Sequence, residues 1–450
     1  MGLLDKLAQQ RLGPPNENEN EAQSKKDVPY IDMYSDLKIR IHQEVIDEIN
    51  KNQLGKNEKE DTDGIQKTIE EIMDLEATHI NRADKAKISQ DLLNDIVGYG
   101  PLEILLKDPD ISEIMVNGPN RVYIEKSGII ELSEVVFKDD NHVMNIIDRI
   151  VSSVGRHIDE SSPMVDARLQ DGSRVNAVIP PLSLVGPIIT IRKFSKKPIS
   201  VEQLLDFGSM SKKMIAFLEA CVKGKLNIIV SGGTGSGKTT TLNVLSSFIP
   251  ANERIITIED AAELQLFQDH LITLESRPPN LEGRGRISIR DLVVNALRMR
   301  PDRIIIGEVR STETIDMLQA MNTGHDGSLT TIHANTPRDA MSRIETMVLM
   351  SGVDLPLRAI RDQTTSALDI IVQQSRLRDG TRKVISITEV IGLEGDVVIM
   401  QELYKYEMSG QMDSDGKFKG RFKSMGIRPR CVEKIIHNGV MVNDDWFNEN

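Results

Sequence analysis

Cysteine is scarce in this chain of 450 residues, which contains only Cys221 and Cys431. The two lie too far apart for a metal-ligand motif, and their rarity is typical of a reducing compartment. Long apolar runs are also missing, since none approaches the roughly 18 residues that cross a membrane. The N-terminus lacks the apolar stretch of a secretory signal. We therefore expect a soluble, cytoplasmic protein.

Basic charge is in short supply as well, because the formal net charge is −13 at pH 7. Proteins that bind nucleic acids in general usually carry a basic surface, so this balance disfavours nucleic acid as a partner. A hydrophobic content of 39% is enough to build packed cores. The length predicts two or three domains.

Composition and periodicity change several times along the chain. Apolar residues at helical spacing, with a polar interruption from Lys51 to Asp63, predict a group of N-terminal helices. Short alternating runs around the Asp171-Gly172 turn predict strands of a small α/β domain. The predicted segments are a disordered tail at 1–30, a helical domain at 31–96, an α/β domain at 97–195, a linker at 196–202, a larger α/β domain at 203–408 and a C-terminal extension at 409–450.

The segment 203–408 alternates short apolar runs with helical patterns, which predicts a mostly parallel sheet between helices. Thr336-Pro337 has the pattern of a helix start. Later runs and the Asp379-Gly380 turn predict an antiparallel extension of the sheet. The expected parallel strands are Ile228–Val230, Ile255–Ile258, Ile272–Leu274, Ile304–Ile306 and Thr330–Ile332.

The most informative motif is a glycine-rich octapeptide between a predicted strand and a predicted helix. That context is the one a phosphate-binding loop requires, because glycines let backbone N–H groups surround phosphate oxygens. Lys238 can reach the β- and γ-phosphates, and the Thr239 hydroxyl can bind Mg²⁺. The predicted nucleotide-binding residues of the loop are Gly232, Gly233, Thr234, Gly235, Ser236, Gly237, Lys238, Thr239 and Thr240.

Carboxylates follow two of the predicted strands. Glu308 ends the run Arg303–Gly307, which resembles a Walker B strand except that Gly307 stands where a first acid is often found. We expect Glu308 to position or activate an attacking water. Glu259 and Asp260 are candidate Mg²⁺ ligands, and Glu263 is a further catalytic candidate, although an acid favoured by a helix N-terminus remains an alternative for Glu263.

Other polar residues surround these strands. Arg298 and Arg300 precede the Walker B-like strand and could stabilise a transferring phosphate from a neighbouring subunit, or could be cations at a helix end. His333 is a candidate phosphate or water sensor, or a hydrogen-bonded core histidine. Zinc needs more ligands than the histidines here supply, so we do not expect a zinc site.

Four ordered elements carry a family resemblance: GGTGSGKT, the Asp box TIEDAAEL, the atypical Walker B strand IIIGEVR and the His box TGHDGSLTTIHAN. Together they resemble the secretion ATPases of type II secretion, type IV secretion and type IV pilus systems. Within that group the sequence is most similar to the CpaF/TadA branch, which powers Tad pili. The stretches that carry this branch assignment are Asp159–Arg168, Asp171–Asn176, Ser276–Gly283 and Leu297–Asp302.

The resemblance implies an α/β fold: a RecA-like P-loop ATPase domain, preceded by a smaller PAS-like α/β domain and N-terminal helices. It also implies a homohexameric ring that uses ATP/ADP and Mg²⁺ and associates peripherally with inner-membrane platform proteins at the cytoplasmic face. ATP would lie between the two α/β domains and drive their relative motion. Arginines of the smaller domain would contact nucleotide, with Arg168, Arg174 and Arg192 as candidates.

Alternative functions remain open. A type IV or type II secretion ATPase that moves effector proteins shares every motif listed above. A RecA-like DNA motor shares the phosphate loop, but the acidic balance disfavours it. A nucleotide-gated scaffold without hydrolysis is compatible with a single Walker B acid.

Overall fold

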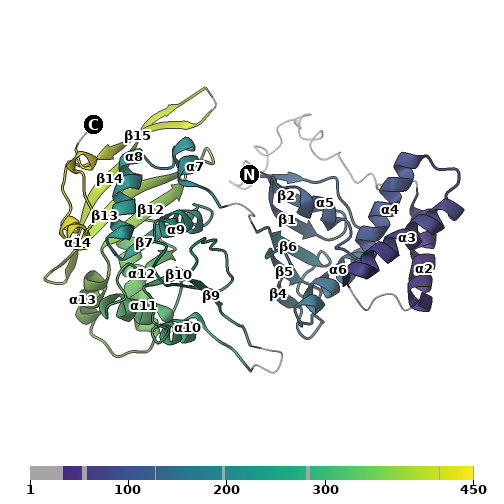
Figure 1. Cartoon of the computed structure of the whole chain (residues 1–450), viewed down its shortest axis with the longest axis horizontal. Helices are drawn as coiled ribbons and strands as arrows, with labels where there is room; N and C mark the ends of the chain where they lie inside the picture. Colours follow the sequence, from purple (N-terminus) through teal and green to yellow (C-terminus); the bar gives the residue numbers. More distant parts are fainter. Residues whose placement is uncertain are drawn as a thin grey trace, which may run out of the picture. The chain divides into compact units, whose positions relative to one another are not determined.

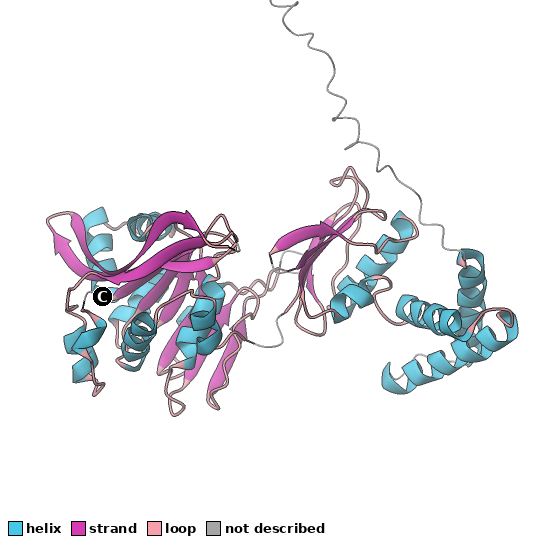
Figure 2. Ribbon diagram, turned by 90° about the horizontal axis from the view of Figure 1, so that it is seen from above, coloured by secondary structure: helices cyan, strands magenta, loops and turns pink. Residues whose placement is uncertain are grey.

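The chain divides into two compact units between Phe194 and Ser195, which can be followed in Figures 1 and 2. This computed structural model describes residues 34–52, 58–126, 128–194, 198–279, 284–414 and 416–448. The predicted tail at 1–30, part of the predicted linker and part of the Ser276–Gly283 stretch lie outside these ranges. Within them, no helix combines the length and the apolar character of a membrane span.

The first unit begins with helices whose apolar residues recur about every four positions. They are α2 (Ser35–Asn52), α3 (Glu58–Glu76) and α4 (Arg82–Ile96). The predicted polar interruption from Lys51 to Asp63 is too long, because α3 already begins at Glu58; glutamate and lysine favour helix despite their polarity. The residues of the shared core are Leu37, Ile41, Val45, Ile65, Ile69, Met73, Ala77, Ile80, Ile88 and Leu92.

The rest of the first unit is an antiparallel sheet with helices. The sheet order is β3-β2-β1-β6-β5-β4, and each neighbouring pair is antiparallel. Helix α6 packs apolar residues such as Ile146 and Ile150 against alternate strand residues such as Ile114 and Ile189. The elements are α5 (Leu102–Lys107), β1 (Ile111–Asn117), β2 (Val122–Lys126), β3 (Ile129–Leu132), α6 (Asp140–Ser153), β4 (Met164–Arg168), β5 (Arg174–Val178) and β6 (Ile188–Arg192).

The second unit alternates strands and helices before it ends in antiparallel strands. Its strands are β7 (Ile228–Gly232), β8 (Ile255–Glu259), β9 (Leu271–Glu275), β10 (Arg303–Val309), β11 (Leu329–Ile332), β12 (Ile370–Arg376), β13 (Arg382–Glu394), β14 (Val397–Met412) and β15 (Phe418–Ser424). Its helices are α7 (Val201–Asp206), α8 (Lys212–Lys223), α9 (Lys238–Ser247), α10 (Ile289–Ala296), α11 (Glu313–Asn322), α12 (Pro337–Met350), α13 (Leu357–Ala367), α14 (Val432–His437) and the 3₁₀ turn η2 (Asp444–Trp446).

These strands form one sheet in the order β15-β14-β13-β12-β7-β11-β10-β8-β9. Neighbours from β12 to β9 are parallel, and β13, β14 and β15 extend the sheet antiparallel. The predicted parallel sheet, its antiparallel extension and the α/β fold class are therefore confirmed. Strand β14 continues to Met412, so the boundary predicted between 408 and 409 falls inside a strand.

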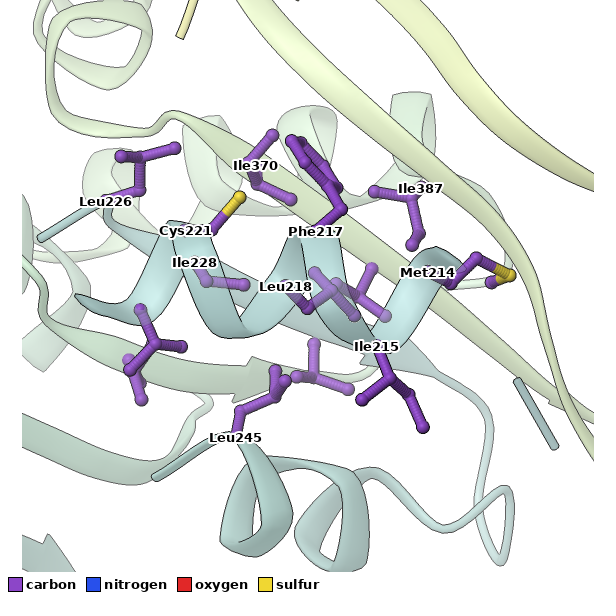
Figure 3. Close-up of a cluster of buried hydrophobic side chains, with 14 of the residues drawn as sticks. Met214, Ile215, Phe217, Leu218, Cys221, Leu226, Ile228, Leu245, Ile370 and Ile387 are labelled. Atoms are coloured by element: carbon purple, nitrogen blue, oxygen red, sulfur yellow. The ribbon is translucent and has the colours of Figure 1, made fainter. Parts of the chain in front are cut away.

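Apolar cores cover both faces of this sheet. Ile228 and Val230 of β7 face one core, which α8 and α9 cover, whereas Ile229 between them faces the other, covered by α10–α13. Figure 3 shows Phe217 and Leu218 of α8 packed beside Ile228 in the first core. Because both faces are buried, β7 begins with three consecutive apolar residues, Ile228–Val230, as parallel strands of this kind usually do.

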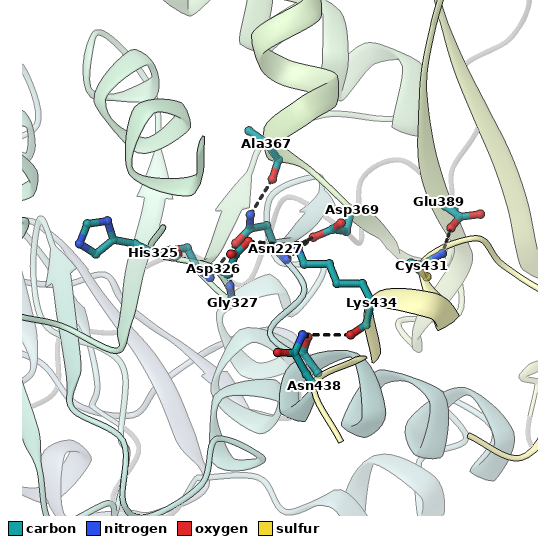
Figure 4. A network of polar contacts seen from close by, with 12 residues as sticks. Asn227, His325, Asp326, Gly327, Ala367, Asp369, Glu389, Cys431, Lys434 and Asn438 are labelled. Atoms are coloured by element: carbon teal, nitrogen blue, oxygen red, sulfur yellow. Dashed lines mark hydrogen bonds and ion pairs between the residues drawn. The ribbon is translucent and has the colours of Figure 1, made fainter. Parts of the chain in front are cut away.

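A buried asparagine joins the amino-terminal ends of three strands. Asn227, directly before β7, accepts hydrogen bonds from the backbone N–H groups of Gly327 and Ser328. It also donates to the Ala367 carbonyl, as Figure 4 shows in part. One side chain thus satisfies three buried backbone groups that would otherwise lose their partners.

Three ion pairs reinforce the same end of the sheet. Lys434 Nζ of α14 lies 3.0 Å from Asp369 Oδ2 and 3.0 Å from Asp326 Oδ1. Arg303, which is fully buried at the start of β10, pairs with Glu253 and donates to the Gly327 carbonyl. Together they fix the loop that precedes β11.

We expect Gly327→Ala to destabilise the second unit far more than Gly324→Ala. Both glycines have left-handed backbones (φ 81° and 93°), so each alanine costs about 1–2 kcal/mol of strain. A Cβ at Gly327 would also overlap the Arg303 guanidinium, whereas one at Gly324 meets nothing within 4 Å. Displacing Arg303 from Glu253 adds about 3–5 kcal/mol.

Urea unfolding followed by the fluorescence of Trp446 measures this difference. Trp446 is the one tryptophan of the chain, and it packs against the core of the second unit. Equal unfolding midpoints for the two variants would contradict the predicted overlap with Arg303.

Candidate active site

The predicted phosphate loop has the backbone geometry of an anion cradle. It starts at Gly232, the last residue of β7, and reaches Lys238, the first residue of α9. Gly235 and Gly237 have φ values of 67° and 93°, which favour glycine. A Cβ at Gly232 would lie 2.6 Å from Ser236 Oγ. Glycine is therefore required at these three positions, and the N-terminus of α9 adds a partial positive charge.

Lys238 lies at the base of this loop. Its ammonium donates to the Gly233 carbonyl over 2.9 Å and lies 3.3 Å from His333 Nδ1. Thr239 and Thr240 follow in the first turn of α9 and are partly exposed. The loop thus presents a cation and two hydroxyl-bearing residues at the same edge of the sheet.

Glu308 and His333 meet at that edge because β10, β11 and β7 are parallel neighbours. Glu308 is close to the carboxyl end of β10, and His333 directly follows β11. Glu308 Oε1 lies 3.0 Å from His333 Nε2. His325, the other His-box histidine, precedes β11 and so belongs to the opposite end of the strand. The contacts form a chain from Lys238 through His333 to Glu308.

The environment of His333 favours its neutral form. Burial lowers the pKa of His333, and the nearby charges of Lys238 and Arg310 lower it further, although Glu308 acts in the opposite direction. With the proton on Nε2, the imidazole can accept from Lys238 through Nδ1, while Nε2 lies against Glu308 Oε1 in the 3.0 Å contact. Neutral His333 can therefore connect the phosphate loop to the carboxylate.

The Asp box contributes a buried carboxylate beside Gly307. Glu259 accepts hydrogen bonds from the backbone N–H groups of Glu263 and Leu264. A Cβ at Gly307 would lie 2.8 Å from Glu259 Cγ. Glycine at the position of the usual first Walker B acid therefore leaves room for Glu259. The Asp260 carboxylate accepts a hydrogen bond from Ser276.

Sequence reasoning missed Arg310. Its guanidinium donates to Glu308 Oε2 over 2.6 Å and lies 3.8 Å from Asp260 Oδ2. The hydrogen bond to Glu308 raises the pKa of Arg310, and the charges of Asp260 and Glu263 act in the same direction. The spacing could have revealed it, because residues two apart on a strand share a face.

Arg298 and Arg300 do not approach Glu308 within this chain. Both are exposed before β10 begins at Arg303, whereas Glu308 is near the other end. Five residues of strand separate Arg303 from Glu308 by roughly 16 Å. A role at the phosphate would therefore have to be toward a neighbouring subunit, and a cation at the end of α10 (Ile289–Ala296) is the alternative.

The structure brings the arginines of the smaller α/β domain into one row. Arg168 on β4 pairs with Arg174 on β5, and Arg174 pairs with Arg192 on β6. Arg192 Nε lies 3.9 Å from Glu113 Oε1. Directly paired residues share a face of the sheet, so three guanidinium groups are neighbours there.

The residues present fit a nucleotide with a magnesium ion better than a metal held by protein alone. Among the described residues, no group of three or more His, Cys, Asp or Glu could hold a metal ion. Magnesium usually takes only one or two protein ligands and uses substrate phosphates for the rest. A Cβ added at Gly233 would meet nothing within 4 Å, so the loop is open on that side.

Residues 95–423 match the family described as Type II/IV secretion system protein, and this chain belongs to that family. A putative conjugal transfer protein of Mycobacterium tuberculosis is 34% identical over 312 residues, covering 68% of this chain and 88% of that protein. The type IV secretion system protein VirB11 of Bartonella quintana is 33% identical over 325 residues, covering 64% and 90%. The structure of the pilus retraction motor PilT with bound ADP matches with a TM-score of 0.49 and 24% identity, covering 65% and 81%.

We expect ATP turnover to depend on neutral His333. Because its pKa is lowered, kcat/KM should stay constant as the pH falls through the ordinary histidine value of about 6.5 and should decline only below it. Protonation would place a second cation beside Lys238 and remove the acceptor at Nδ1. In His333→Gln, which keeps a donor but does not titrate, the decline attributable to histidine should disappear.

The pH profile of steady-state hydrolysis for both proteins measures this effect. His437→Gln, at an exposed position on α14 of the same unit, is the matched control and should keep the wild-type profile. A wild-type decline centred at or above pH 6.5, or an unchanged decline in His333→Gln, would contradict the prediction.

Proposed function

We propose that this protein hydrolyses ATP to ADP and phosphate and converts the reaction into movement. The observation that carries the proposal is the chain of contacts from Lys238 in the phosphate loop through His333 to Glu308. Membership of the secretion ATPase family supports nucleotide binding, usually with Mg²⁺.

The residues of the site have roles that their positions allow. The phosphate loop, Gly232–Thr240, would bind the phosphates, with Lys238 on the β- and γ-phosphates. Glu308 would orient an attacking water and accept its proton. His333 would hold Glu308 Oε1, and Glu263 would support the same end of the sheet.

Magnesium would be held by few protein groups. Thr239 is the proposed direct ligand, and Glu259 and Asp260 would act through water, because both carboxylates already accept protein hydrogen bonds. Bound Mg²⁺ would neutralise phosphate charge during hydrolysis.

A homohexameric ring is part of the proposal. Arg298 and Arg300 would act on a neighbouring subunit, since they do not reach Glu308 in their own chain. Arg168, Arg174 and Arg192 would meet nucleotide phosphates, because a row of guanidinium groups is favourable when it faces an anion. Acidic net charge makes nucleic acid an unsuitable partner.

Motion would come from the two units. We retain the domain boundaries given above, except the one between 408 and 409, as part of this proposal, with a linker at 196–202 between the two α/β domains. ATP binding and product release would favour different arrangements of those domains. In a ring at the cytoplasmic face of the inner membrane, this could turn or lift a platform protein.

The branch of the family is also proposed. The stretches Asp159–Arg168 and Leu297–Asp302 favour a CpaF/TadA-type motor that assembles or retracts Tad pili. A type IV secretion ATPase is the second candidate, because relatives carry the names of conjugal transfer and type IV secretion proteins.

We expect Lys238→Ala and Glu308→Gln to lower Mg²⁺-dependent ATP hydrolysis about 100-fold or more, by loss of a phosphate cation and of the base. Glu308→Gln should still bind nucleotide, because it leaves the loop intact. Hydrolysis and oligomer mass are measured in the same samples. Glu394→Gln, exposed at the end of β13, is the control and should hydrolyse ATP like wild type. A wild-type protein that is monomeric and does not hydrolyse ATP would contradict the proposed motor.

The pilus proposal predicts a phenotype in the source organism. Replacing the chromosomal copy with Glu308→Gln should abolish surface filaments counted by electron microscopy, with secreted proteins unchanged by mass spectrometry. Intact filaments with lost secretion would instead favour the type IV secretion ATPase.

A further inference from the structure

A hairpin on the far side of β7 places two arginines beside the phosphate loop. Arg376 ends β12 and Arg382 begins β13, and the two are directly paired across the strands. Arg382 Nε donates to the Gly235 carbonyl over 2.9 Å. A Cβ at Gly235 would lie 3.6 Å from Arg376 Nη1. Both guanidinium groups therefore lie next to the loop that we assign to phosphates.

A pair of guanidinium groups is chemically suited to a phosphate. A phosphate can accept hydrogen bonds from two guanidinium groups at once, and such charge-assisted bonds are the strong ones. Arg376 and Arg382, directly paired across β12 and β13, therefore have the chemistry of a phosphate-binding pair.

The hairpin is held rigidly in this position. Asp379 in its turn accepts hydrogen bonds from Thr381 N and Oγ1 and from the backbone N–H of Phe418 at the start of β15. Gln374 pairs with Gly232 in the β12–β7 register and accepts a hydrogen bond from the Thr241 hydroxyl of α9. Strand-borne side chains with fixed supports are suited to a binding site.

Strand order decides which part of a nucleotide the arginines face. The contacts among Lys238, His333 and Glu308 run from β7 toward β11 and β10. The phosphate to be cleaved therefore belongs on the β11–β10 side of β7. Strand β12 lies on the other side of β7. The nucleoside end extends away from the cleaved phosphate and thus toward the β12–β13 hairpin.

We propose that Arg376 and Arg382 bind the α-phosphate of the nucleoside di- or triphosphate, making the hairpin the subsite for the nucleoside end of the ligand. This inference rests on the proposed function. The proposed phosphate-binding groups then number three: the phosphate loop, the arginine row of the smaller domain, and the pair Arg376 and Arg382 from the second unit itself. Both arginines lie across β7 from Glu308 and His333, so the expected effect of their loss is measured in ligand binding.

The test compares two probes in the presence of Mg²⁺: ADP, which carries an α-phosphate, and inorganic pyrophosphate, which can fill the positions next to Lys238 alone. Arg376→Ala and Arg382→Ala should each weaken ADP binding about tenfold and change pyrophosphate binding less than twofold. Arg382→Lys should recover part of the loss. Isothermal titration calorimetry on the full chain measures the dissociation constants of both probes for wild type and for each variant.

Arg378→Ala is the matched control. Arg378 is an exposed residue of the hairpin turn, so its removal lowers the local charge equally and should leave both ligands unaffected. Equal weakening of ADP and pyrophosphate in Arg382→Ala would mean that Arg382 only braces the loop through Gly235, and this would overturn the proposal. So would unchanged ADP binding in both variants.

The proposed function fails in a different way. If wild-type protein with native Trp446 fluorescence binds neither ADP nor pyrophosphate, the nucleotide site itself is refuted, and the α-phosphate subsite with it. If wild-type protein binds both probes, and both arginine variants bind ADP as tightly as wild type does, only the α-phosphate subsite is refuted.

Discussion

The parallel register of β7, β11 and β10 is the constraint on which the candidate site depends. Parallel strands end at one edge of the sheet, so residues from distant parts of the chain meet there: Lys238 after β7, Glu308 on β10 and His333 after β11. Register in turn depends on the two cores, because a slip of one residue would exchange Ile228 and Ile229 between opposite faces. Core packing thus sets the site geometry.

Charge at this edge is balanced in pairs. Glu308 contacts His333 through one oxygen and Arg310 through the other, while the buried Glu259 is satisfied by backbone N–H groups. These partners offset the repulsion that clustered carboxylates would otherwise suffer. A carboxylate oxygen can accept more than one hydrogen bond, so a water can bind Glu308 beside its contacts with His333 and Arg310.

The sequence was sufficient for features that local rules govern. Continuous apolar runs predicted the parallel strands, and the glycine pattern predicted the loop from Gly232 to Lys238, because strand burial and left-handed backbones leave direct marks in a sequence. Glu308 followed from its place after a strand. The reason why residue 307 is glycine did not follow from the sequence, because Glu259 from another strand fills the space that a side chain would need.

Cross-strand pairing was beyond sequence reasoning for the same reason. Arg376 and Arg382 flank a predicted turn, yet their closeness to Gly235 depends on β12 lying next to β7. Arg298 and Arg300 adjoin the Walker B-like strand in sequence, but they precede the end of the strand that lies opposite Glu308. Direction along a strand, as much as adjacency, decides what a side chain can reach.

Local arrangement of arginines explains how an acidic chain can bind a polyanion. The net charge of −13 repels phosphate at long range, but salt screens such repulsion beyond about 8–10 Å. Arg168, Arg174 and Arg192 form one cross-strand row, and Arg376 and Arg382 form another pair. An anion that contacts several guanidinium groups of one arrangement gains several charge-assisted hydrogen bonds. The same pattern thus favours binding of a multiply charged phosphate at defined positions over general attraction of anions to the surface.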